Sequence, residues 1–152
     1  MSNAAQQKSR EKKRGDTAVN GLIAGILAGL VMAVYLVLAG VLSDVPPAVM
    51  LGRFDPALEA RWLNGTLAHL AVSSVYGVVF AFLFAAMVHI RPSLLRFGWL
   101  LGLVYGLALL TMARGVVLPI ADSSLLQIST GHLLIAHAIY GLLLGFEIGR
   151  NW

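Results

Sequence analysis

Residues 18–42 read AVNGLIAGILAGLVMAVYLVLAGVL, and this stretch decides the class of protein. It lies within 27 uncharged residues between Asp16 and Asp44, and a helix that crosses a bilayer needs about 20 apolar residues. The whole chain is similar, because 59% of its 152 residues are hydrophobic and only 12% are charged. A soluble domain carries about 25% charged residues, so this composition excludes an ordinary cytosolic enzyme.

Three further stretches of 29, 17 and 24 uncharged residues follow along the chain. Together with the first stretch they predict four transmembrane helices. The helices are expected near residues 18–42, 63–89, 94–117 and 125–148. The predicted fold is therefore all-α, an integral membrane four-helix bundle over residues 16–152, preceded by a disordered basic cytoplasmic tail over residues 1–15.

The lysines and arginines that flank the predicted helices are distributed unequally. If the N-terminus is cytoplasmic, the inner flanks hold Lys8, Arg10, Lys12, Lys13, Arg14, Arg91, Arg96 and Arg150, and the outer side holds Arg53, Arg61 and Arg114. Cytoplasmic loops carry the excess of positive charge. We therefore expect a bacterial inner (cytoplasmic) membrane protein with both termini in the cytoplasm. The basic tail has no accompanying basic and aromatic surface, so the expected partner is membrane lipid rather than nucleic acid.

Two loop features predict local structure outside the spans. Asp55 and Pro56 have the residue types of a helix N-cap and first helical position, which predicts a short interfacial helix over residues 57–62. Ser124 and Gln127 have the spacing of a capping box directly before the fourth span.

Small residues recur every four positions in all four predicted helices. Helices in lipid associate through close backbone contact, which small residues permit. The stripes therefore predict a tightly packed bundle, with some faces left over for a neighbouring subunit. The expected helix-packing glycines are Gly21, Gly25 and Gly29 in the first span, Gly77 in the second, Gly98, Gly102 and Gly106 in the third, and Gly141, Gly145 and Gly149 in the fourth.

The same pattern indicates an internal duplication. Tyr76 and Gly77 in the second span match Tyr140 and Gly141 in the fourth, and the glycine stripes of the first and third spans match each other. The chain is thus expected to form two tandem helical hairpins. Because both hairpins start on the same side, they form a parallel repeat whose axis lies along the membrane normal.

Ionisable residues within spans are costly and mark candidate sites. His69 and His137 continue the small-residue stripes of their helices, so both are expected to face the bundle interior. One hypothesis is that His69, with His132 or His137, supplies two axial ligands to a haem b while Arg114 pairs with a propionate. Depth favours His132 as the partner, and helix face favours His137.

Three other interpretations remain open. Each histidine can instead hydrogen-bond a carbonyl or hydroxyl group of a neighbouring helix, and Arg114 can extend to the outer headgroups. A role in quinol binding or proton relay is the third. The sequence predicts no metal site and no catalytic residue, because it lacks the usual enzyme motifs and has no pair of carboxylates within the spans.

The chain resembles the YagU-like small bacterial inner-membrane proteins, whose function is not established. The resemblance is carried by Gly21–Gly29, by His69, and by Gly131, His132 and Leu133 at the start of the last span. It covers the four spans and implies a four-helix membrane protein.

The expected function is that of a non-enzymatic accessory subunit of a larger membrane complex, respiratory or photosynthetic, because the chain is nearly all span. The first alternative is a haem b or quinol-binding protein that uses His69 with His132 or His137. The second is a small channel or transporter built from several copies of this chain.

Overall fold

The computed structural model describes residues 3–151, with side chains from residue 14 onward, and over this range it contains helices and no strand. Four segments are long and apolar enough to cross a membrane: Arg14–Val41, Trp62–Ile90, Pro92–Ile120 and Thr130–Arg150. This confirms the prediction of an all-helical chain with four apolar helices, which indicates a multi-pass membrane protein. The helices are α1 (Asn3–Val41), α2 (Pro47–Gly52), α3 (Trp62–Ile90), η1 (Pro92–Phe97), α4 (Gly98–Met112), η2 (Ala113–Val117), α5 (Leu118–Ile120), η3 (Ser124–Gln127) and α6 (Thr130–Arg150).

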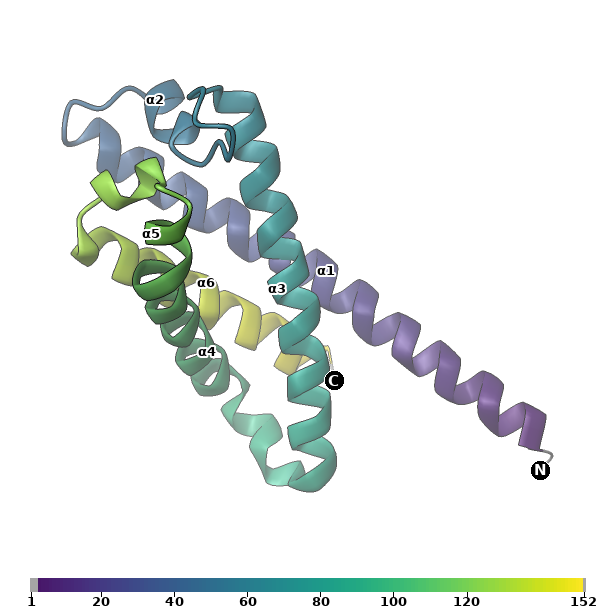
Figure 1. The fold of residues 1–152 in the computed structure, drawn as a ribbon. Helices are drawn as coiled ribbons and strands as arrows, with labels where there is room; N and C mark the ends of the chain where they lie inside the picture. Colours follow the sequence, from purple (N-terminus) through teal and green to yellow (C-terminus); the bar gives the residue numbers. More distant parts are fainter. Residues whose placement is uncertain (1–2, 152) are drawn as a thin grey trace.

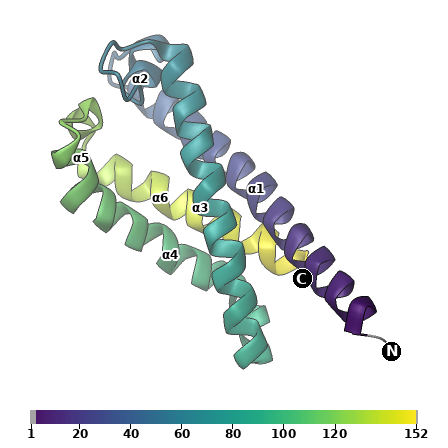
Figure 2. The ribbon, with the colours of Figure 1, turned by 45° about the vertical axis from the view of Figure 1, so that its right-hand side comes forward.

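The long helices are arranged as two close pairs. Helix α1 packs along α3, α4 packs along α6, and the two pairs meet mainly through α1 and α6. Helices α3 and α4 make few contacts with each other, and in Figures 1 and 2 they separate as they leave the turn at η1. Helices α2 and α5 lie at the opposite end of the molecule from this turn (Figure 1).

Glycines allow the backbones of α1 and α3 to touch. A Cβ atom added to Gly21 would lie 2.8 Å from the carbonyl oxygen of Gly77, and one added to Gly25 would lie 2.5 Å from that of Ser73. At Gly29 it would lie 2.5 Å from the side chain of Ser73. Any larger residue at these positions would force the two helices apart.

The pair formed by α4 and α6 has a similar contact. A Cβ atom on Gly102 would overlap the carbonyl oxygen of Gly141, and one on Gly145 would overlap that of Gly98. Gly149 differs, because its added Cβ would have ordinary contacts of 3.7 and 3.8 Å.

The glycine stripes of α1, α4 and α6 thus pack within the chain rather than against another subunit. This corrects the expectation that some stripes remain free for a neighbour. Large apolar side chains fill the space between the two pairs instead. Leu36 of α1, Phe80 and Phe84 of α3 and Leu144 of α6 are fully buried.

The structure corrects two helix boundaries predicted from sequence. Helix α6 begins at Thr130 rather than near residue 125, because Ser129 is its N-cap and its side chain accepts a hydrogen bond from the backbone N–H of His132. Ser124 starts the short helix η3 and does not cap α6. At the other end, α1 extends back to Asn3, so residues 3–15 of the predicted disordered tail are helical; residues 1–2 lie outside the described range.

The first long loop also differs from its prediction. Residues 57–62 form no interfacial helix before α3 begins, and the short helix of this loop is α2. Asp55 is buried, and its two carboxylate oxygens accept hydrogen bonds from the backbone N–H groups of Ala57 and Arg61, both at 3.1 Å. The carboxylate therefore closes a compact loop instead of capping a helix.

Candidate functional site

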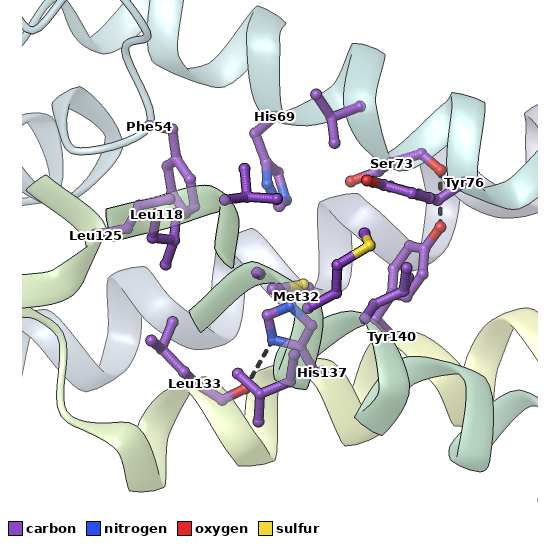
Figure 3. A pocket seen from close by; sticks show the side chains of 16 residues that line it. Met32, Phe54, His69, Ser73, Tyr76, Leu118, Leu125, Leu133, His137 and Tyr140 are labelled. Atoms are coloured by element: carbon purple, nitrogen blue, oxygen red, sulfur yellow. Dashed lines mark hydrogen bonds between the residues drawn. The ribbon is translucent and has the colours of Figure 1, made fainter. Parts of the chain in front are cut away.

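A cavity of about 250 Å³ lies among α3, α4 and α6, toward the end of the molecule that carries α2 and α5. Most of its lining is apolar. The polar residues in the lining are His69, Ser73, Tyr76, His137 and Tyr140 (Figure 3). An apolar cavity with a few convergent polar groups is the usual form of a small-molecule site.

The imidazole of His69 reaches the cavity from α3 and is held from two sides. Its Nε2 donates a hydrogen bond to the carbonyl oxygen of Gly29 on α1 at 2.9 Å. Its ring also packs against Phe54, with ring centroids 4.5 Å apart. These contacts fix the ring orientation from one helix and one loop.

His137 enters the same cavity from α6, on the opposite wall from His69 (Figure 3). Its Nδ1 donates a hydrogen bond to the carbonyl oxygen of Leu133, one turn earlier in the same helix, at 2.9 Å. The prediction that His69 and His137 both face the interior is confirmed.

The two histidines lie at the same distance along their own helices. His69 lies seven residues after the start of α3, and His137 lies seven residues after the start of α6. At 1.5 Å per residue, both are about 10 Å along their helices. Of the two candidate partners, the structure places His137 and not His132 in the cavity of His69.

His132 lies outside this cavity. Its Nδ1 is hydrogen-bonded to the hydroxyl of Tyr35 on α1 at 3.0 Å. It lines a second cavity of about 280 Å³ that also includes Arg53 and Ser129. His132 therefore links α1 to α6 near the end of the bundle.

Two tyrosine hydroxyls join the helix pairs close to the cavity. The hydroxyl of Tyr140 on α6 donates to the carbonyl oxygen of Ser73 on α3 at 2.7 Å. The hydroxyl of Tyr105 on α4 donates to the carbonyl oxygen of Tyr76 on α3 at 3.0 Å. The sequence analysis used the Tyr–Gly pairs of the second and fourth spans but did not identify Tyr105, although Tyr105 precedes Gly106 in the same way.

Arg114 lies in a wide helical turn, η2, and not among the residues that line the cavity. The helical hydrogen bonding becomes wider just before Pro119, because proline has no backbone N–H and its ring clashes with the carbonyl four residues earlier. The backbone N–H of Leu118 accordingly bonds to the carbonyl oxygen of Ala113, five residues back. The Nη1 atom of Arg114 is buried with no hydrogen-bond partner among the described residues.

These residues do not fit a haem held by two histidines. The Nε2 of His69 is already bonded to Gly29, His132 lies in another cavity, and Arg114 does not reach the site. The cavity of about 250 Å³ is also below the range of about 300–1,000 Å³ for drug-sized ligands, and a haem is larger still. Over the described residues, no group of three or more His, Asp or Glu side chains is placed to hold a metal ion.

Several lining residues are also exposed at the surface of the molecule. Val72 of α3 is 54% exposed, and Met112 and Val117 on the opposite side are 40% and 45% exposed. These residues lie within the apolar spans. They therefore form a mouth between α3 and α4 that opens sideways, at membrane depth.

Comparison with protein-family models, with curated proteins and with solved structures finds no match for this chain. The resemblance to YagU-like proteins stays a prediction, and the geometry of the cavity is the basis for assigning a function.

Proposed function

We propose that this chain is a non-enzymatic membrane protein that binds a small apolar molecule from the bilayer in the cavity among α3, α4 and α6. The observation that carries the proposal is that His69 and His137, from the two helix pairs, share one apolar cavity within the spans. Polar side chains at membrane depth are expensive and mark sites. The mouth between α3 and α4 would admit a ligand directly from the lipid.

We also propose that the protein lies in a bacterial inner membrane, with both termini in the cytoplasm. The excess of basic residues in the flanks on that side supports this orientation. We further propose that the pair α1–α3 and the pair α4–α6 are a tandem repeat of one hairpin, each closed by a glycine zipper. The similar glycine contacts in the two pairs support the duplication.

A matched pair of variants tests ligand binding. Ala113 lines the cavity, whereas Ala108, on the preceding turns of the same segment, is exposed and does not line it. Ala113→Leu should fill part of the cavity, because it adds a larger side chain to the cavity wall. Ala108→Leu should leave the cavity unchanged.

The measurement is mass spectrometry of the small molecules that co-purify with the full chain from native membranes in mild detergent. We expect a bound molecule in the wild type and in Ala108→Leu, and at least about fivefold less of it in Ala113→Leu. Finding only bulk phospholipid, or the same amount in all three proteins, would contradict the proposal.

A second candidate is an accessory subunit of a larger respiratory or photosynthetic membrane complex. One observation favours it: only 17% of the apolar window in Pro92–Ile120 is buried, against 33% to 44% in the other three spans. The span that contains α4 is thus the least buried of the four. Co-purification with large subunits at a fixed ratio would support this role, and recovery of the chain alone under the same conditions would count against it.

A further inference from the structure

We propose that the cavity selects a ligand whose head donates hydrogen bonds, such as a phenol or hydroquinone with an apolar tail. The same molecule without hydroxyl protons should bind less well. This inference rests on the proposed function, because it requires the cavity to be a ligand site. It follows from the hydrogen-bonding state of the two imidazoles.

Both imidazole rings in the cavity are uncharged. The residues that line the cavity include no acidic side chain that could balance an imidazolium. An unbalanced charge at membrane depth is costly. Each ring is therefore neutral, and a neutral imidazole has one protonated nitrogen and one acceptor nitrogen.

The hydrogen bond to Gly29 fixes the tautomer of His69. A carbonyl oxygen can only accept a hydrogen bond, so the Nε2 that lies 2.9 Å from the Gly29 oxygen must carry the proton. The Nδ1 of His69 is then an acceptor. The packing of Phe54 on the ring keeps it in this orientation.

The hydrogen bond to Leu133 fixes His137 in the opposite tautomer. Its Nδ1 lies 2.9 Å from the carbonyl oxygen of Leu133 and must carry the proton. The Nε2 of His137 is then the acceptor, and the ring projects into the cavity (Figure 3).

The lining of the cavity offers a ligand more hydrogen-bond acceptors than donors. The hydroxyl proton of Tyr140 is already donated to the carbonyl oxygen of Ser73. The hydroxyls of Ser73 and Tyr76 can act in either sense, and the lining has no Lys, Arg, Asn, Gln or Trp side chain. The cavity thus has two obligatory acceptors and no obligatory donor.

A ligand that carries only carbonyl or ether oxygens would leave both imidazole acceptors unpaired in an apolar space. Sites built around buried polar groups reject analogues that cannot pair with them. A hydroxyl head would instead donate to His137, to His69, or to both.

The test uses the full chain in lipid nanodiscs, with 4-nonylphenol and its methyl ether as probes and empty nanodiscs to correct for partition into lipid. The two probes share an apolar tail and differ in the hydroxyl proton. Titration calorimetry should show the phenol binding at least about tenfold more tightly than the ether. In His137→Phe this preference should fall below about threefold. In His89→Phe it should be kept, because His89 is exposed and does not line the cavity.

The experiment distinguishes failure of the donor preference from failure of the proposed function. Equal binding of phenol and ether to the wild-type protein would overturn the donor preference while leaving the cavity as a binding site. Binding of neither probe would overturn the proposed function and this inference with it. Because the wild-type comparison needs no substitution, the outcome does not depend on the folding of any variant.

Discussion

The two helix pairs are joined by the same kind of glycine contact but use their histidines differently. In the pair α1–α3, His69 donates across the interface to Gly29 of the partner helix. In the pair α4–α6, His137 donates to Leu133 of its own helix. Each ring keeps one acceptor nitrogen, but only the hydrogen bond of His69 also holds two helices together. The same residue type in one cavity can therefore join two helices in one hairpin and bond only within its own helix in the other.

The largest expected effect is at the glycine contacts. Gly102→Leu would drive a side chain into the backbone of α6 at Gly141, so we expect the free energy of unfolding to fall by about 3 kcal/mol or more. Gly25→Leu should have a similar effect on α1 and α3. Thermal unfolding in mild detergent would measure both.

Gly149 provides the control for this prediction. Its added Cβ would have only ordinary contacts, so Gly149→Ala should change stability by less than about 0.5 kcal/mol. If Gly102→Leu were as stable as Gly149→Ala, α4 and α6 would not touch where the structure places their contact.

A smaller effect is expected where a tyrosine joins the two pairs. Tyr140→Phe removes the buried 2.7 Å hydrogen bond to Ser73 and keeps the ring. Interhelical hydrogen bonds in membrane proteins contribute about 0.6 kcal/mol on average and up to about 1.7, so a loss of about 1 kcal/mol is expected. Chemical unfolding of the variant beside Tyr105→Phe, whose bond is longer and only partly buried, would rank the two contacts. A larger loss in Tyr105→Phe would contradict the ranking.

The smallest expected effect is the difference in stability between the two histidine variants. His69→Phe should lower the free energy of unfolding by about 0.6 kcal/mol, because an interhelical bond is lost. His137→Phe should lower it by less than about 0.3 kcal/mol, because only a bond within α6 is lost. Parallel unfolding curves test this difference. An equal loss in both variants would show that His137 stabilises the fold as much as His69 does.

The four spans could be predicted from sequence because lipid imposes a simple requirement on length and charge. A helix that crosses the membrane cannot leave its backbone unpaired or carry many charges. The ends of the helices were harder to predict, since they depend on which of several similar residues caps them. Ser129 rather than Ser124 caps α6, and Asp55 closes a loop instead of starting a helix.

The site was only partly predictable for a related reason. The spacing of small residues placed His69 and His137 on inward faces, but depth favoured His132, and only the packed structure shows that His137 shares the cavity with His69. The mouth formed by Val72, Met112 and Val117 depends on how α3 and α4 separate. No local pattern encodes that separation, because it results from the packing of α1 against α6.

The most direct test of the central claim is to locate a bound ligand on the chain. A nonylphenol that carries a photoreactive diazirine in its tail can be irradiated with the full protein in native membranes, and the labelled residues identified by peptide mass spectrometry. The account predicts labels on cavity residues from different helices, such as Val72 and Leu109, that disappear when unlabelled 4-nonylphenol is in excess. Labels confined to exposed residues outside the cavity, such as Val75 and Val104, and unaffected by competition, would contradict it.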